Sequence, residues 1–257
     1  MKLRVTKALL LLVLPLSLSI ISCQKKLGFE EGAAPGLPSP VELQFKNIVN
    51  RFDDLHFDST YTLGLNFIKY HVFKYYISNV EFVNTDGDTI KIPDTYFLVD
   101  HSKPESLKAR FNVPSGAYYG MSFLIGIDSA RNFKGPQIGP LDPALGMYMN
   151  PNDGYIMAKL EGTIALSPLP GNVFIFHPGG VKAPYSVLSR RHFKLGGYFD
   201  FSPGRKVVVS LTADVRQWFS PNNAFGTTFS CTTPGQHSYN LGQNYYKMFE
   251  FVSLRYE

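Results

Sequence analysis

Histidine and methionine supply the candidate metal ligands of this sequence, but they form no compact ligand motif. None of the six histidines lies in an HxH or HExxH arrangement, and there is no Cys-x-x-Cys pair. Any metal site must therefore be assembled from segments that are distant in the chain. His177 is the strongest candidate, because it ends the apolar run VFIF and precedes Pro-Gly-Gly, at a strand-to-loop transition where a rigid scaffold presents ligands.

Two further residues complete the candidate metal set. Met149 offers a thioether sulfur, which is a good ligand for Cu(I), and His237 follows a Gly-Gln pair in a segment that can return to the same end of the fold. Structural roles are the alternatives, because His177 can hydrogen-bond within its own loop and methionine is a common core residue. The set is too small for tight zinc binding.

Carboxylates suggest a second kind of chemistry, hydrolysis by a proton-transferring acid pair. Asp128 and Asp142 sit beside the Ser, Arg and Pro residues that are typical of braced turns, which favours a structural role. The sequence also lacks a GxSxG elbow and a phosphate-binding glycine loop. We therefore expect a protein that is not an enzyme. The four carboxylates concerned are Asp128, Asp142, Asp153 and Glu161.

Residues 126–161 carry most of these candidates and have an unusual composition. The segment contains five glycines and four prolines, which exclude a continuous helix or a central strand. It also contains many large apolar residues, which a solvated linker would lack. Long apolar loops in compact domains are usually functional, so we predict an ordered functional loop that packs against the domain.

Short β-strands separated by turns are expected for the other segments of the chain. Tyr, Phe and Val are abundant, Gly and Pro are scattered, and no long helical periodicity occurs. Asp86-Gly87 between two β-rich runs predicts a tight hairpin turn. The fold class that follows is all-β, an antiparallel two-sheet β-sandwich with a long ordered loop. The expected strands are residues 41–45, 61–67, 73–83, 89–92, 95–100, two strands within 110–119, then 119–127, 155–160, 172–177, 193–201, 206–211 and 249–255.

Helix is expected at only two places. Residues 214–219 predict one helical turn, and residues 240–246 are ambiguous, with a short helix as one alternative. Cys231 is expected to be a small buried hydrophobic residue rather than a reactive thiol or a metal ligand.

The N-terminus has the features of a bacterial lipoprotein signal peptide. Lys2, Arg4 and Lys7 precede an apolar run that ends in a small residue followed by Cys23. We expect removal of residues 1–22 and acylation of Cys23, for example with palmitate, which anchors the protein to the outer membrane on its periplasmic or surface side. Residues 23–40 are rich in Gly and Pro and predict a flexible tether to a domain of residues 41–257.

Charge argues against nucleic acid as a partner. The formal net charge is +5, and because three positive charges leave with residues 1–22 the mature chain carries only +2. No basic cluster interleaved with aromatic residues occurs beyond Arg190-Arg191-His192. With Cys23 acylated, Cys231 has no partner for an intrachain disulfide.

Several short motifs occur in order along nearly the whole mature chain. They are FKYYISNV at 73–80, the Asp86-Gly87 turn, YFLVD at 96–100, VPSG at 113–116, IGIDSARN at 125–132, GPLDPALGMY at 139–148, Gly154-Tyr155, Leu160-Glu161-Gly162 and His177. In this combination the chain resembles the MbnP-like family of secreted or lipid-anchored bacterial proteins. That family is named after a methanobactin-associated copper-binding protein and is common among lipoproteins of Bacteroidetes.

The resemblance implies a β-sandwich that binds copper in the cell envelope, through histidine and a tryptophan that is oxidised to kynurenine. It also implies a di-haem peroxidase or another outer-membrane protein as partner. This sequence departs from the family where relatives carry Trp-x-Trp, because Met149-Asn150-Pro151 stands there and the single tryptophan is Trp218. His177 matches the family's His-Gly motif, so one implied ligand is retained.

Two functions are compatible with this sequence. The first is a lipid-anchored, non-catalytic β-sandwich that binds copper through His177 and Met149, with His237 as a further candidate ligand. The second is a metal-free envelope protein that uses the aromatic-rich loop for interaction or structure, as the replaced tryptophans favour. Retention of copper by the purified protein separates the two.

Overall fold

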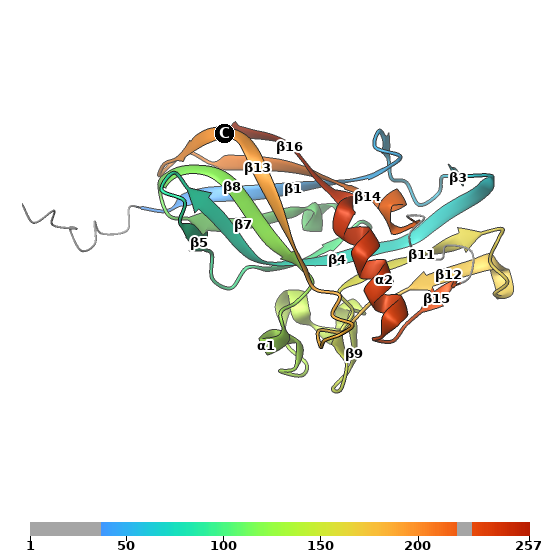
Figure 1. Cartoon of the computed structure of the whole chain (residues 1–257). Helices are drawn as coiled ribbons and strands as arrows, with labels where there is room; N and C mark the ends of the chain where they lie inside the picture. Colours follow the sequence, from blue (N-terminus) through green and yellow to red (C-terminus); the bar gives the residue numbers. More distant parts are fainter. Residues whose placement is uncertain (1–36, 220–227) are drawn as a thin grey trace, which may run out of the picture. The chain divides into compact units, whose positions relative to one another are not determined.

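The computed structural model describes residues 37–219 and 228–257, which form two large β-sheets and one two-stranded sheet, with little helix (Figure 1). The predicted signal peptide, Cys23 and residues 24–36 of the predicted tether lie outside the described residues. Within the described residues, no helix is both long and apolar enough to cross a membrane. The prediction of an all-β fold with two sheets is confirmed.

The smaller sheet has five strands and begins two residues earlier than expected, at Ser39. β1 lies between β14 on one side and β7 and β2 on the other, and β16 pairs with β14. β1 and β14 run parallel, unlike the antiparallel arrangement expected throughout. Parallel neighbours need a long crossover, and the larger sheet lies between these two strands in the sequence. The strands are β1 (Ser39–Val49), β2 (Asp53–Asp54), β7 (Lys108–Val113), β14 (Val207–Asp214) and β16 (Phe249–Tyr256).

The larger sheet has nine strands arranged around the long strand β4. β11 pairs with the first half of β4, and β8 pairs with the second half. Along its other edge, β4 pairs successively with β3, β6 and β5. β12 and β15 form a second parallel pair. The strands are β3 (Tyr61–Leu63), β4 (Asn66–Asn84), β5 (Thr89–Lys91), β6 (Tyr96–Asp100), β8 (Gly116–Ile125), β11 (Ala158–Ile164), β12 (Val173–Phe176), β13 (Ser189–Phe201) and β15 (Ser230–Cys231).

The hairpin between β4 and β5 confirms the turn predicted at Asp86-Gly87. Gly87 has φ +87°, a left-handed conformation that costs glycine little. The Asn84 side-chain oxygen accepts the amides of Asp86 at 3.1 Å and Asp88 at 2.7 Å, which fixes the turn.

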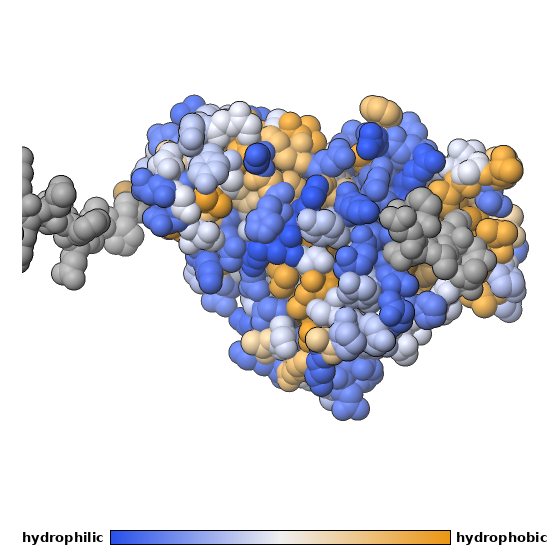
Figure 2. Space-filling model, in the orientation of Figure 1, coloured by the Kyte–Doolittle hydropathy of each residue, from blue (hydrophilic) through white to orange (hydrophobic). Residues whose placement is uncertain are grey.

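The strand predicted at 61–67 is wrong, because the chain reverses in its middle. Gly64 has φ +61°, and β3 folds back on the start of β4 as a hairpin. A period-two pattern is the same in a straight strand and in the two arms of a tight hairpin, so alternation alone did not reveal the turn. Leu65 and Phe67 are 102% and 66% exposed, and Figure 2 shows apolar side chains gathered at the end of the molecule where β3 lies.

The core between the two sheets is mainly aromatic. Phe45 of β1 contacts the rings of Tyr75 of β4 and Phe123 of β8, and all three contact Phe249 of β16. The contacts are edge-to-face, the geometry that the ring quadrupole favours. Trp218 is 1% exposed and packs against Tyr245 in a tilted arrangement, with ring centroids 4.8 Å apart.

Both predicted helical segments are present, and Cys231 is buried as predicted. Trp218 belongs to the 3₁₀ helix η5 (Val215–Phe219), and Tyr245 ends helix α2 (Gln236–Tyr245). Cys231 is 5% exposed, and burial raises the pKa of its thiol. The thiol is therefore a poor nucleophile at neutral pH.

Gly162 in β11 marks a close approach of two backbones. A Cβ atom at this position would lie 2.0 Å from the carbonyl oxygen of Lys69 and 2.6 Å from the ring of Phe174. We expect Gly162→Ala to lower the free energy of unfolding by about 3 kcal/mol, because β4 and β11 must separate to admit the methyl group. Urea unfolding measures the change. The control is Gly197→Ala in β13, where a Cβ meets only the Phe199 ring at 3.8 Å; equal stability of the two variants would contradict this packing.

His101, which directly follows β6, belongs to a polar network with Asn47 and Tyr75. Asn47 Nδ2 lies 3.2 Å from His101 Nδ1, and the Tyr75 hydroxyl donates to Asn47 Oδ1 at 2.9 Å. Burial lowers the pKa of His101 below its ordinary 6.5, against the opposing effect of a hydrogen bond with the Leu55 backbone. Protonation therefore opposes folding, so the contribution to stability is complete above pH 6.5 and is lost as pH falls through the folded pKa.

We therefore expect the melting temperature to fall between about pH 7.5 and about pH 5, and to fall less in His101→Gln. Thermal unfolding followed by circular dichroism at both pH values measures the difference. An identical fall in the variant and the native protein would show that His101 does not contribute.

Candidate functional site

The predicted loop is ordered and packs on the face of β4 opposite the sandwich core. It contains α1 (Ser129–Asn132), the 3₁₀ helices η2 (Gly139–Leu141) and η3 (Pro143–Leu145), β9 (Tyr148–Asn150) and β10 (Gly154–Tyr155). Tyr76 points to this face, while its neighbours Tyr75 and Ile77 belong to the main core. A second apolar cluster covers Tyr76 and holds the loop down. Its other buried members are Ile127, Leu141, Met147, Tyr155, Ile156, Met157 and Val187.

Asp128 fixes the beginning of the loop to the sheet. Its carboxylate accepts hydrogen bonds from the Arg131 amide at 3.1 Å, from Asn79 Nδ2 at 3.2 Å and from the Tyr96 hydroxyl. Burial alone would raise the pKa of Asp128, but these hydrogen bonds outweigh it and hold the pKa below its usual value. Burial and the bond to Asp128 raise the pKa of Tyr96 to about 12. Arg131 lies over the Tyr96 ring at 4.9 Å.

Asn132 joins the two ends of the loop. It is 1% exposed, its Oδ1 accepts the Tyr155 amide at 2.9 Å, and its Nδ2 donates to the Asp153 carbonyl at 3.2 Å. Gly154 lies directly against it, with φ +76° and no room for a Cβ, which would lie 2.2 Å from Asn132 Nδ2. This Asn-Gly contact sets the path of β10.

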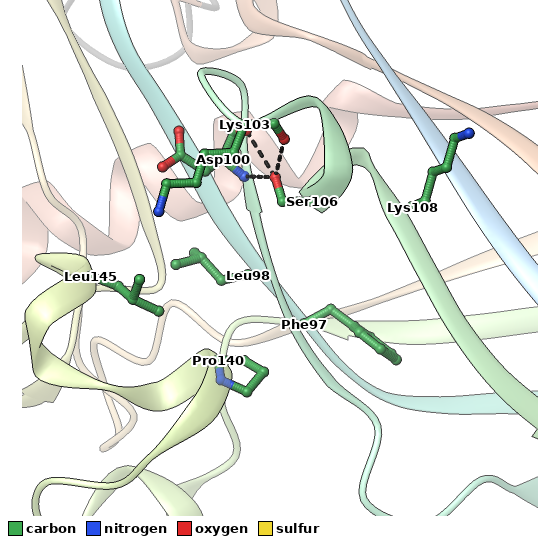
Figure 3. A pocket seen from close by; sticks show the side chains of 8 residues that line it. All are labelled: Phe97, Leu98, Asp100, Lys103, Ser106, Lys108, Pro140 and Leu145. Atoms are coloured by element: carbon green, nitrogen blue, oxygen red, sulfur yellow. Dashed lines mark hydrogen bonds between the residues drawn. The ribbon is translucent and has the colours of Figure 1, made fainter.

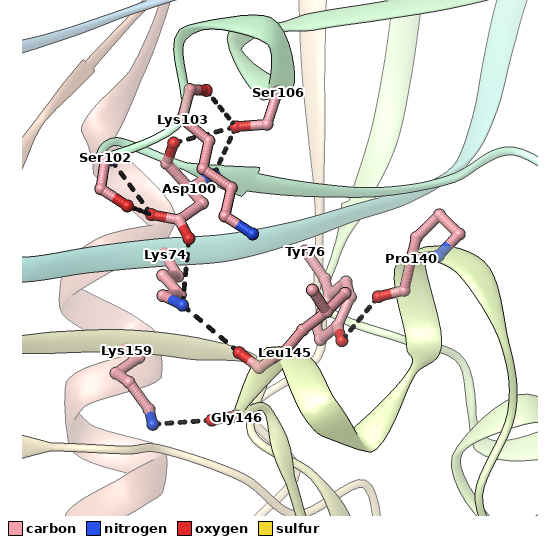
Figure 4. Close-up of polar contacts among 10 residues, drawn as sticks. All are labelled: Lys74, Tyr76, Asp100, Ser102, Lys103, Ser106, Pro140, Leu145, Gly146 and Lys159. Atoms are coloured by element: carbon pink, nitrogen blue, oxygen red, sulfur yellow. Dashed lines mark hydrogen bonds and ion pairs between the residues drawn. The ribbon is translucent and has the colours of Figure 1, made fainter.

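Two lysines of adjacent strands hold the middle of the loop (Figure 4). Lys74 of β4 pairs in register with Lys159 of β11. Lys74 Nζ donates to the Leu145 carbonyl at 3.3 Å, and Lys159 Nζ donates to the Gly146 carbonyl at 2.7 Å. These carbonyls end η3, where a helix is rich in unpaired acceptors. Lys74 also forms an ion pair with Asp100 at 3.0 Å.

His177 lies beside this bracing and forms a pair with Glu161. His177 follows β12, Glu161 is in β11, and the two strands pair antiparallel. His177 Nε2 lies 2.6 Å from Glu161 Oε1, and the two side chains are 18% and 31% exposed. A carboxylate only accepts hydrogen bonds, so in the neutral ring Nε2 carries the proton and Nδ1 keeps its lone pair. No described residue forms a hydrogen bond with Nδ1.

The environment of His177 favours the neutral ring. Burial lowers the pKa of His177, and the nearby Lys159 acts in the same direction, while the bond to Glu161 opposes them. The His177 amide donates to the Cys231 carbonyl at 2.7 Å, which fixes the backbone. Glu161 therefore orients the ring and the Cys231 carbonyl fixes its backbone, which leaves a neutral imidazole with one nitrogen available as a ligand.

Met149 lies against Gly179, which is two residues after His177 in the chain. A Cβ at Gly179 would lie 2.2 Å from Met149 Cε and 3.6 Å from its sulfur, so the absence of a side chain there makes room for the thioether. Ile156 and Gly179 form an isolated β-bridge, and the Ile156 amide donates to the Met147 carbonyl at 2.8 Å. The segments carrying His177 and Met149 are thus joined through residues 156–157.

His237 is exposed in the first turn of α2. Its neighbour Ser238 reaches the same region, because the Gly179 amide donates to Ser238 Oγ at 3.4 Å. No contact joins the His237 side chain to His177 or Met149 among the described residues, which also contain no group of three or more His, Cys, Asp or Glu side chains arranged to hold a metal. Cys23 lies outside the described residues.

The remaining carboxylates of the hydrolase alternative have bracing contacts. Asp142 accepts the Ala144 amide at 2.8 Å and caps η3, and Asp153 accepts from Asn150 Nδ2 at 2.8 Å. Glu161 is the partner of His177 that sequence reasoning missed, because it was considered only as a possible catalytic acid. The available signal was its place in the Leu160-Glu161-Gly162 motif.

The fold and this loop define a class of protein, a two-sheet β-sandwich that carries a long braced loop on the outer face of one sheet. The sequence model of the MbnP family matches residues 38–236. The chain therefore belongs to the MbnP family, as the motifs predicted.

A solved structure supports the same fold assignment. MbnP from Methylosinus trichosporium matches with a TM-score of 0.52 at 14% sequence identity, over 76% of this chain and 83% of that one. At this identity the likeness shows the fold alone. No curated protein sequence matches the chain.

Asn132 offers a direct test of the loop bracing. We expect Asn132→Ala to lower the free energy of unfolding by about 2 kcal/mol, because it leaves the buried Tyr155 amide without an acceptor. Hydrogen exchange followed by mass spectrometry should show faster exchange in residues 153–156, with unchanged protection of β4. Unchanged exchange in both segments would contradict the bracing role.

Proposed function

We propose that this MbnP-family protein is a non-catalytic cell-envelope protein that binds copper as Cu(I), with His177 Nδ1 as the principal ligand and the Met149 sulfur as the second. The observation that carries the proposal is the 2.6 Å contact between His177 Nε2 and Glu161 Oε1. Metal-binding histidines commonly bond their second ring nitrogen to a carboxylate, which fixes the tautomer and aims the other nitrogen at the metal.

The donor types in this region suit copper better than zinc. Imidazole nitrogen and thioether sulfur are ligands for Cu(I), whereas a structural zinc site needs four closely placed donors. The described residues offer no cluster of three His, Cys, Asp or Glu side chains. A low-coordinate Cu(I) site is therefore the arrangement that these residues fit.

His237 is proposed only as an auxiliary ligand. The contact of Ser238 with Gly179 places the first turn of α2 beside the Met149 segment, which supports this role. Its exposed ring is not fixed by a partner like Glu161, so we expect it to contribute less than His177.

The envelope location is proposed from the sequence. The charged start, apolar run and Cys23 support a lipid anchor in the outer membrane. The association of the family with a methanobactin-linked copper protein supports the metal, and a di-haem peroxidase or another envelope protein is the proposed partner on the same ground.

Cu(I) affinity measured by anaerobic competition with a chromophoric chelator tests the copper proposal. We expect His177→Ala to abolish binding, and Glu161→Gln to weaken it by about 10- to 100-fold, because the ring loses its orienting carboxylate. Met149→Leu should weaken binding while preserving packing on Gly179. The control is His192→Ala, an exposed histidine in β13.

Cu(I) binding that is equal in the native protein and His177→Ala would overturn the proposed site. Absence of binding by the native protein would favour the metal-free alternative, in which the loop serves interaction or structure. Circular dichroism of each variant separates loss of a ligand from loss of the fold.

A further inference from the structure

A pocket of about 230 Å³ lies where the loop meets the edge of β6 (Figure 3). Its apolar walls come from two sides, with Phe97 and Leu98 on β6 and Pro140 and Leu145 on η2 and η3. Asp100, Lys103, Ser106 and Lys108 complete the lining. The pocket is thus an apolar slot between sheet and loop with polar groups along one edge.

Most of the polar groups at this edge are already bonded within the protein. Asp100 Oδ1 accepts from the Ser102 amide at 3.0 Å and its hydroxyl at 2.7 Å, while Asp100 Oδ2 pairs with Lys74. Burial alone would raise the pKa of Asp100, but the Ser102 and Lys74 contacts outweigh it and lower the pKa. The carboxylate therefore stays ionised, and its charge is balanced by the Lys74 ammonium. Ser106 Oγ lies within hydrogen-bond distance of the Asp100 amide and carbonyl and of the Lys103 carbonyl.

Lys103 is the charged group near the apolar walls whose charge is not balanced by an ion pair among the described residues. Its side chain is exposed, and its ammonium extends toward the loop in Figure 4. Among the described residues, neither Lys103 Nζ nor Lys108 Nζ forms a hydrogen bond or an ion pair. Lys108 lies beyond Ser106, away from the apolar walls (Figure 3). The uncompensated charge at the pocket is therefore positive and sits beside apolar surface.

We propose that this pocket binds a small hydrophobic carboxylate, with the apolar body between Leu98 and Leu145 and the carboxylate on Lys103. The class follows from the lining, because a carboxylate gains an ion pair with the ammonium, a neutral apolar molecule gains none, and a cation would be repelled by it. The size follows from the volume, which is below that of pockets for drug-sized ligands. A short aliphatic or single-ring acid fits these limits.

Octanoate is the probe, with octanol and octylamine as ligands of the same chain length and different charge. We expect octanoate to bind with shifts in the amide NMR signals of Leu98, Ser106 and Leu145, and to bind about two- to fivefold more tightly than octanol, the gain typical of an exposed ion pair. Octylamine should bind more weakly than octanol. Lys103→Gln should reduce octanoate affinity to that of octanol.

Lys134→Gln is the matched control, because Lys134 is an exposed lysine of the same loop that does not line the pocket. Its octanoate affinity should equal that of the native protein. The proposal is overturned by no octanoate binding, by equal binding of octanoate and octanol, by shifts elsewhere, or by unchanged affinity in Lys103→Gln.

Discussion

The loop over residues 126–157 must satisfy its backbone N–H and C=O groups largely without a sheet ladder, and the site depends on how it does so. Buried backbone groups are almost always paired in native proteins, and the four prolines of the segment restrict pairing within it. Side chains supply many of the missing partners. They are Asp128 for the Arg131 amide, Asn132 for the Tyr155 amide and Asp153 carbonyl, Tyr76 for the Pro140 carbonyl, Tyr155 for the Leu141 carbonyl, Lys74 for the Leu145 carbonyl and Lys159 for the Gly146 carbonyl.

Many of these side chains lie in the motifs by which the sequence resembles its family. Asp128 and Asn132 lie in the IGIDSARN motif, and Tyr76 lies in FKYYISNV. The motifs therefore describe a scaffold, the set of side chains that keeps a long irregular segment on a sheet.

Alternation and turn chemistry were sufficient to predict the two-sheet fold, because each strand carries its own local pattern. The Asp86-Gly87 turn could be predicted for the same reason, because its residue types are a local signal. The hairpin at Gly64 was not, since alternation continues through it. The parallel pairing of β1 with β14 could not be predicted from local sequence patterns either, because the relative direction of two strands depends on which distant strands pair.

The site was predicted less completely than the fold, for a related reason. His177 was identified from its place at a strand end, which is local information. Its pairing with Glu161 depends on the register of β11 against β12, and register is a property of two strands together. The positions of Met149 against Gly179 and of Leu145 in the same pocket as Leu98 likewise depend on how the loop packs on the sheet.

Position 149 shows that the scaffold and the chemistry it presents vary separately. Met149 stands where the family resemblance implies tryptophan, yet the bracing side chains around it are in place. Gly179 makes room for the residue at 149 by having no Cβ, and the backbone on both sides is fixed by the bridge to Ile156. Met149 therefore offers a thioether, where the resemblance implies an indole, on a loop segment whose path is fixed by neighbouring side chains and backbone.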